Sequence, residues 1–285
     1  MSLLVVQPGL LSLIEDQGRP GLGALGVCSS GAFDRTALRQ VNALLGNDPS
    51  AAVIEVLGGG LVLRAEKNHV LAVTGGVGPV RVDDDPVAHG RVLSLHQGQQ
   101  LHVDSITAGV RAYVGASGGI EVVTELGSAS RDTLAGLGPP PLDYGQILDV
   151  GGARHAPDAE DIHSLTETGE LTLDVVLGPR DDWFTPESVR LLLESAWQVS
   201  PASDRIGVRL DGPALDREHD GELPSEPCLR GSIQVTADGR PIVLGPDHPV
   251  TGGYPVVAVV VDSDTDRLAQ LRPGQILRFR RRTLP

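Results

Sequence analysis

Short apolar runs bounded by glycine, proline or aspartate recur along the whole 285-residue chain, and they constrain its fold more than any other feature. Their length suits a strand better than a helix. The runs are 51–57, 70–74, 99–103, 111–115, 171–177, 232–236, 256–261 and 275–279. Because 36 glycines and 21 prolines supply turns between the runs, the sequence predicts a mainly β (α+β) fold with few helices.

Helical signals are confined to three places. Asp34 is placed to cap an amphipathic stretch that stops at Gly46, since aspartate accepts from free N–H groups and glycine ends a helix. A second helix is expected to begin with Thr185 as its N-cap and to carry its apolar face as far as Trp197. A shorter helix is expected at 265–271.

One segment suggests an internal boundary. Residues 151–170 are polar and acidic without apolar periodicity, as in a linker or a long exposed loop. This segment divides the single 1–285 unit into two expected lobes, 1–150 and 171–285. The lobes share the pattern L-x-x-G-Q-x-L-x-apolar at 95–103 and 271–279, which indicates related β units.

Charge and composition argue against several classes of protein. A net charge of −14 repels a phosphate backbone, so no nucleic-acid partner is expected. The only lysine, Lys67, lies outside any G-x-x-x-x-G-K-[ST] motif, and Met1 is the only methionine, so neither a P-loop nor an A-M-K-M biotin attachment site is present. The stretch 1–14 lacks the basic region of a signal peptide, and no apolar run approaches the ~18 residues of a membrane helix.

Cysteines and candidate metal ligands favour structural roles. Cys28 and Cys228 lie far apart without C-x-x-C spacing, which fits free thiols in a reducing cytoplasm and buried side chains rather than nucleophiles. The histidines show no H-E-x-x-H or H-x-H spacing, so no metal site is expected. The acidic run 83–85 beside His89 is interpreted as a solvated turn.

Two stretches are candidate anion-binding sites. The first, 15–35, is rich in glycine and ends at the helix start beside Asp34, where free N–H groups suit a carboxylate or phosphate; a turn-rich connector is the alternative. In the second, Arg205 and Arg209 are four residues apart, so in a strand both would leave one face and clamp a carboxylate. A surface ion pair with Asp204 is the alternative reading.

The loop 244–255 gathers polar side chains between two expected strands. Loops that carry such groups on a rigid scaffold often serve function. His248 or Asp247 is suited to proton transfer and Tyr254 to hydrogen bonding with a substrate. The alternative is that the adjacent glycines form a hairpin turn and Tyr254 only packs.

A series of ordered motifs extends over nearly the whole chain. They include Glu15-Asp-Gln-Gly-Arg-Pro-Gly21, Ser30-Gly-Ala-Phe-Asp34, Gly118-Gly-Ile120, Leu177-Gly-Pro179, Ser203-Asp-Arg-Ile-Gly-Val-Arg-Leu210, Gly231-Ser-Ile-Gln-Val235 and Thr251-Gly-Gly-Tyr-Pro255. In these motifs the chain resembles the allophanate hydrolase subunit 2 family, also described as biotin-dependent carboxyltransferase, the 5-oxoprolinase C subunit or KipA-like.

The resemblance implies a fold, a reaction and partners. The fold is a cyclophilin-like β-barrel with a smaller flanking lobe. The implied role is that of the C subunit of a cytoplasmic, ATP-dependent 5-oxoprolinase, which opens 5-oxoproline to glutamate together with a homologous B subunit (allophanate hydrolase subunit 1 or KipI-like) and an A subunit. As an enzyme, the chain would be inactive or poorly active alone, and ATP would bind in the assembled complex.

Two other functions remain open within the resemblance. One is the carboxyltransferase half-domain of a biotin-dependent urea carboxylase or allophanate hydrolase system. The other is a KipA-like protein that binds and antagonises a sensor-kinase inhibitor. In each enzyme reading the ligand is a small carboxylate or amide.

The resemblance also suggests roles for individual residues. Arg205 or Arg209 would hold the substrate carboxylate, Asp204 would position the arginines, and Tyr254 would orient the reacting carbonyl. Tyr254, Asp204 and Arg205 are therefore the expected catalytic residues. The expected substrate-binding residues are Arg209, Gly252, Gly253, Thr251, Gln234, Asp34 and His248.

Overall fold

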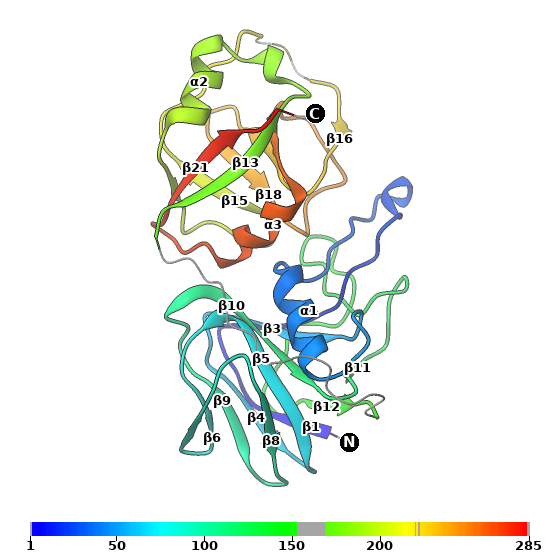
Figure 1. Ribbon diagram of the computed structural model, residues 1–285. Helices are drawn as coiled ribbons and strands as arrows, with labels where there is room; N and C mark the ends of the chain where they lie inside the picture. The colour runs from blue at the N-terminus through cyan, green and yellow to red at the C-terminus, as the bar shows by residue number, and fades with distance from the viewer. Residues whose placement is uncertain (1, 153–168, 220, 222, 284–285) are drawn as a thin grey trace. The chain divides into compact units, whose positions relative to one another are not determined.

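The computed structural model describes residues 2–152, 169–219, 221 and 223–283, which form two compact units (Figure 1). The described residues of unit 1 are 2–19, 30–132 and 136–152, and those of unit 2 are 20–29, 133–135 and 169–283 without 220 and 222. Most elements are strands, so the predicted mainly β class is confirmed. Of the linker expected at 151–170, residues 153–168 lie outside the described part of the chain.

Unit 1 contains two antiparallel sheets. The first has seven strands in the order β11 (Ile120–Glu121), β12 (Ile147–Val150), β1 (Ser2–Pro8), β4 (Leu61–Ala65), β9 (Gln100–Val103), β6 (Val80–Val82) and β7 (Asp85–Val87). The second has five strands in the order β2 (Leu11–Glu15), β3 (Val53–Leu57), β10 (Ala108–Ala116), β5 (His69–Val77) and β8 (Val92–Leu95). Side chains from both sheets form one hydrophobic core, as expected when two amphipathic sheets pack face to face.

The helix α1 (Arg35–Leu44) covers the other face of the five-stranded sheet (Figure 1). Its Leu38 and Val41 pack with Tyr113 of β10 in a second hydrophobic cluster. At Gly115 an added Cβ would lie 2.8 Å from Leu45 and 2.9 Å from Val41, so the glycine allows the helix to approach the strand. Asp34 accepts from the Ala37 N–H at 2.8 Å, which confirms the predicted N-cap.

Unit 2 is built around a closed barrel. Its strands follow the order β13 (Leu171–Leu177), β20 (Val256–Val260), β17 (Ser232–Val235), β18 (Pro241–Leu244), β15 (Gly207–Asp211), β14 (Trp197–Val199) and β21 (Ile276–Arg281). Closure comes from β21, which pairs parallel with β13 and antiparallel with β14. A separate two-stranded sheet joins β16 (Glu226–Pro227) to β19 (Thr251–Gly252).

The helices of unit 2 are short. They are α2 (Pro186–Glu194), α3 (Asp262–Thr265) and the 3₁₀ turns η1 (Gly23–Leu25), η2 (Asp181–Trp183) and η3 (Asp266–Gln270). The Thr185 cap of α2 is confirmed, because its hydroxyl accepts from the Ser188 N–H at 3.1 Å. The expected continuation to Trp197 is wrong, since Trp197 instead pairs with Leu277 in the barrel.

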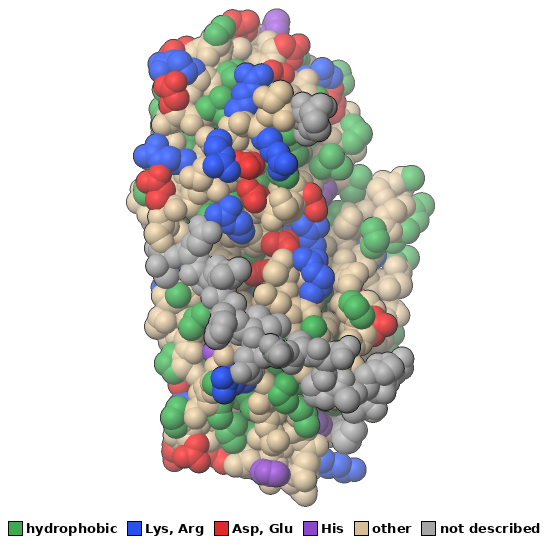
Figure 2. All heavy atoms as spheres, in the orientation of Figure 1, with side chains coloured by type: hydrophobic (Ala, Val, Ile, Leu, Met, Phe, Trp, Pro, Cys, Tyr) green, Lys and Arg blue, Asp and Glu red, His purple; other side chains and the backbone are tan. Residues whose placement is uncertain are grey.

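Ion pairs cover the outside of the barrel. Figure 2 shows basic and acidic side chains interleaved over the part of unit 2 that carries β13 and β21. Arg280 lies 2.6 Å from Asp174, and Arg267 lies 3.6 Å from Asp264. Because both arginines are paired with carboxylates, their charge is less available to an anionic ligand.

A turn built on a glycine–glutamine pair occurs three times in the described part of the chain. In each copy the glutamine Oε1 accepts from the backbone N–H three residues earlier, as His96–Gln99 at 2.9 Å, Asp143–Gln146 at 3.2 Å and Arg272–Gln275 at 3.1 Å. The preceding glycines have positive φ of 87°, 78° and 85° at Gly98, Gly145 and Gly274. The shared sequence pattern at 95–103 and 271–279 therefore has a structural basis, and 142–150 is a third copy.

No helix within the described ranges has both the length and the apolar character needed to traverse a membrane.

Candidate functional site

The loop 244–255 of unit 2, which carries half of the predicted site residues, is anchored by a buried ion pair. Arg205 Nε donates to Asp247 Oδ2 at 2.8 Å, and its Nη2 donates to Oδ1 at 3.0 Å. The exposed fractions of the two side chains are 3% and 0%. The Asp247 N–H also donates to the Arg205 carbonyl at 3.1 Å. A bidentate pair shielded from water holds both side chains in one geometry, so it fixes the position of the loop.

Two segments from earlier in the sequence pack on the same loop within unit 2. The N–H and the hydroxyl of Thr133 donate to Asp247 Oδ2 at 2.9 and 2.7 Å. The thiol of Cys28 donates to the Pro246 carbonyl at 3.1 Å. Asp247 thus accepts two hydrogen bonds from a residue 114 positions away in sequence, which no local pattern indicates.

Three predicted site residues, Gln234, Gly252 and Tyr254, lie together at β19. The Gln234 amide donates to Cys228 Sγ and to the Tyr254 carbonyl, each at 3.3 Å. A Cβ added at Gly252 would lie 2.7 Å from Gln234 Nε2 and 3.0 Å from Cys228 Sγ. Any larger residue at 252 would therefore force the side chains of Gln234 and Cys228 to shift.

The Cys228 thiol in this cluster is not set up as a nucleophile. Burial raises its pKa, the Gln234 hydrogen bond lowers it less, and the charge of Glu226 raises it further. The reactive species is the thiolate, and a raised pKa disfavours it. The interpretation of Cys228 as a buried structural side chain is therefore supported.

The outer part of the loop presents Thr251, Gly253 and Tyr254 to solvent, with Tyr254 46% exposed. His248 is buried, and its Nδ1 lies 2.8 Å from the Pro249 carbonyl. These residues supply hydroxyl and imidazole groups on a loop whose base is rigid.

A second ion pair borders the loop and was not predicted. Glu226 of β16 lies opposite Gly252 of β19, and Arg180 Nε donates to its carboxylate at 3.0 Å. The hydrogen bond to Glu226 raises the Arg180 pKa. Arg180 and Glu226 are 46 positions apart, so only the fold brings this pair to the loop.

The predicted arginine clamp is wrong in its geometry. Arg205 precedes β15 and is buried, whereas Arg209 lies within β15 on its exposed side, so the two side chains do not share a face. Asp204 does not act as the acidic partner of Arg205. Its Oδ1 accepts from the N–H groups of Ile206 and Gly207 at 2.8 and 3.1 Å, which closes a local turn.

Asp34 lies in unit 1, where a buried network holds its backbone. The Asp34 N–H donates to Tyr113 Oη at 2.7 Å, and Tyr113 donates to Glu55 Oε2 at 2.7 Å. Arg111 Nε lies 3.4 Å from Glu55. Burial, followed by the nearby charge of Glu55, raises the Tyr113 pKa well above its ordinary value. A direct role for Asp34 in binding stays a prediction.

The motif that begins at Glu15 forms a packing centre of unit 1. The Asp16 carboxylate accepts from the N–H groups of Gly18 and Ala129, both at 2.7 Å. It also accepts from the hydroxyls of Ser128 and Ser130 at 2.6 and 2.5 Å. With its acceptor sites occupied in this way, Asp16 ties two loops together, which favours the connector interpretation of this stretch.

The acidic run 83–85 forms a turn, as the sequence indicates. Asp83 Oδ1 accepts from the Gln100 N–H at 2.9 Å, and the side chain of Asp84 is fully exposed. In the described part of the chain, no group of three or more His, Cys, Asp or Glu side chains is placed to hold a metal ion.

The sequence profile of the carboxyltransferase domain, subdomains A and B, matches residues 25–281. The chain belongs to this carboxyltransferase domain family. The C subunit of the 5-oxoprolinase of Escherichia coli is 35% identical to this family member over 97% of the present chain and 90% of the relative. The match therefore runs nearly from end to end of both proteins.

Solved structures of other carboxyltransferase-domain relatives have the same fold. The urea amidolyase of K. lactis superposes with a TM-score of 0.91 at 28% identity, over 98% of this chain but only 18% of the enzyme. The protein TTHA0988 superposes with a TM-score of 0.90 at 34% identity, over 98% of this chain and 55% of that protein. In both, this chain corresponds to one part of a longer polypeptide.

Proposed function

We propose that the chain is the C subunit of an ATP-dependent 5-oxoprolinase that converts 5-oxoproline to glutamate together with a homologous B subunit and an A subunit. The observation that carries the proposal is the likeness to a 5-oxoprolinase C subunit across 90% of that relative's length. Urea amidolyase, by contrast, is matched over 18% of its length.

Within this proposal, the exposed part of the loop 244–255 meets the substrate. As water adds to the carbonyl carbon of a lactam, negative charge develops on the carbonyl oxygen, and hydroxyl donors fixed in advance stabilise that charge. Tyr254 and Thr251 present hydroxyls on this loop. Arg205 acts through Asp247 as a positioning residue that keeps the loop in place.

Other chains supply the energy and complete the site. ATP binds in the assembled complex, since Lys67 is the only lysine here and does not belong to a P-loop. This division of roles implies a cytoplasmic hetero-oligomer in which the isolated chain has little or no turnover.

Reconstitution tests the proposal. The purified chain is mixed with its B and A subunits, and glutamate release from 5-oxoproline is followed with ATP, omitting each protein in turn. Release should require all three, and Tyr254→Phe should lower it at least about tenfold if the hydroxyl stabilises the transition state. Tyr144→Phe, at a tyrosine of unit 1 that is 77% exposed, is the matched control and should leave the rate unchanged. Glutamate release that persists without this chain contradicts the proposal.

A carboxyltransferase function is the second candidate, because 98% of this chain superposes with part of the K. lactis urea amidolyase. Biotin would then be carried by another chain, since Lys67 lacks the surroundings of a biotinylated lysine. A stable complex with the B subunit that releases no glutamate but transfers a carboxyl group from carboxybiotin to urea would favour this candidate over the oxoprolinase.

A further inference from the structure

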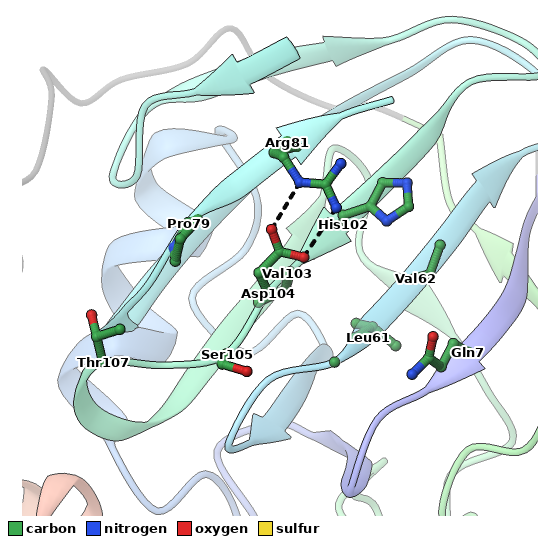
Figure 3. A pocket seen from close by; sticks show the side chains of 11 residues that line it. Gln7, Leu61, Val62, Pro79, Arg81, His102, Val103, Asp104, Ser105 and Thr107 are labelled. Atoms are coloured by element: carbon green, nitrogen blue, oxygen red, sulfur yellow. Dashed lines mark hydrogen bonds and ion pairs between the residues drawn. The ribbon is translucent and has the colours of Figure 1, made fainter. Parts of the chain in front are cut away.

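Unit 1 contains a pocket of about 530 Å³ on the outward face of its seven-stranded sheet, separate from the loop 244–255 (Figure 3). Its centre is a row of side chains from four adjacent strands. Gln7 of β1 lies opposite Val62 of β4, which lies opposite His102 of β9, which lies opposite Arg81 of β6. In a sheet, residues in register point to the same face, so these four side chains line one surface.

A β-bulge turns Gln7 toward this pocket. Val5 pairs with Leu63, and Gln7 pairs with Val62, so Val6 is an extra residue in β1. Because side chains alternate along a strand, Gln7 would otherwise share the inward face of Val5, which is fully buried in the core. The bulge reverses this alternation and leaves Gln7 exposed, and bulges commonly re-aim side chains beside functional sites.

The polar groups of the pocket retain hydrogen-bonding capacity. Arg81 donates to Asp104 through Nε at 2.8 Å and Nη2 at 3.2 Å, and Nη1 donates to the Asp83 carbonyl at 2.8 Å. One Nη2 N–H and a second lone pair on each Asp104 oxygen remain. Within the described residues, the side chains of Gln7 and His102 make no hydrogen bond, and both line the pocket.

We propose that this pocket binds a small uncharged amide, such as a carboxamide, a lactam or a ureido compound. The Arg81–Asp104 pair presents a donor beside an acceptor, which matches a carbonyl oxygen beside an N–H group. The pair is electrically neutral, so it favours an uncharged ligand over a carboxylate. Across the apolar side chain of Val62, the Gln7 amide offers a further donor and acceptor to the other end of the ligand (Figure 3).

Direct binding to the full chain tests the pocket and does not require any catalytic activity. The probes are 2-pyrrolidinone and acetamide, with acetate as the charged counterpart of acetamide, and binding is followed by ¹H–¹⁵N chemical-shift titration. We expect saturable shifts at the Gln7 side-chain amide and at the backbone of Asp104 and Ser105 with both amides. Acetate at equal concentration should give none.

Variants of the pocket separate specific binding from general solvent effects. Gln7→Leu and Asp104→Asn should each raise the dissociation constant at least about fivefold, since the first removes the amide and the second replaces an acceptor oxygen by a donor. Arg64→Ala, which breaks the exposed Arg64–Glu66 pair on β4, is the matched control and should leave binding unchanged. Gln7 is exposed, so its substitution leaves the fold intact. Equal shifts with acetate, no saturable shift in the wild-type chain, or unaltered affinity in Gln7→Leu would each overturn the proposal.

Discussion

Breaking the buried Arg205–Asp247 pair should destabilise unit 2 strongly. In Arg205→Met the Asp247 carboxylate, which has no exposed surface, keeps its hydrogen bonds from Thr133 but loses its cationic partner. Leaving a charge buried without its partner costs about 3–5 kcal/mol. With a urea m-value of about 2 kcal/mol/M, the unfolding midpoint should fall by about 1.5–2.5 M.

Tryptophan fluorescence is a selective probe for this experiment. The chain has two tryptophans, Trp183 and Trp197, and both belong to unit 2. The matched control is Arg240→Met, which breaks the ion pair with Asp211 on the surface of the same unit, where the arginine side chain is 58% exposed. Exposed pairs contribute at most about 1 kcal/mol, so this midpoint should change little.

A double variant tests whether the cost comes from the unpaired charge. Arg205→Met with Asp247→Leu removes both charges, so its loss of stability should be smaller than the sum of the two single losses. If Arg205→Met costs no more than Arg240→Met, or if the two single losses add in the double variant, the account of Arg205 and Asp247 as a mutually dependent anchor of the loop is wrong.

Three further predictions concern the surroundings of the loop and the core of unit 1. Gly252→Ala should lower the unfolding free energy by about 1–3 kcal/mol in urea titration, because its Cβ would lie 2.7 Å from the buried Gln234 amide; an unchanged midpoint would contradict the described packing. Cys28 and Cys228 are 7% and 6% exposed, and burial raises the Cys228 pKa. Iodoacetamide should therefore alkylate the folded chain at least about tenfold more slowly than the chain unfolded in urea, as measured by mass spectrometry. The pKa of Tyr113 is raised in the fold, so its phenol keeps its proton there. Its contribution to the free energy of unfolding is fully present below the ordinary tyrosine pKa of about 10 and is lost as pH rises through the folded pKa. While the proteins remain folded near pH 10.5, Tyr113→Phe should therefore show the same absorbance change at 295 nm as the wild type, and a smaller change would mean that Tyr113 ionises in the folded chain.

Most strands and the starts of α1 and α2 can be predicted from sequence, because apolar runs and capping residues are local signals. The predicted run 51–57 contains β3, whose Ile54 and Val56 belong to the core between the sheets, while Val53 packs in the cluster with α1. The sequence predicts that the apolar face of α2 reaches Trp197, but the helix ends at Glu194. At Trp197 the helical spacing of apolar residues competes with strand pairing to Leu277. Closing the barrel buries the large indole, and this tertiary contact outweighs the local periodicity.

The candidate site can be predicted only in part, because its main contacts join residues that are far apart in sequence. The pattern around Thr251 and Tyr254 marked the loop, but Arg205 and its partner Asp247 are 42 positions apart, and neighbouring residues in sequence suggested Asp204 as the partner instead. The inserted residue Val6 in β1 left no signal, because a bulge depends on the register of two strands rather than on one strand's composition.

Unit 2 is formed by three separate segments of the chain, so it cannot be expressed intact as its C-terminal segment alone. A gene fragment encoding only 169–285 would contain every barrel strand yet omit Cys28 and Thr133, which donate to Pro246 and Asp247. In such a fragment, the Pro246 carbonyl and the Asp247 carboxylate would lose these hydrogen bonds. During synthesis, residues 20–29 leave the ribosome long before the barrel that receives them exists, so this unit can be completed only after the last strand, β21, has been made.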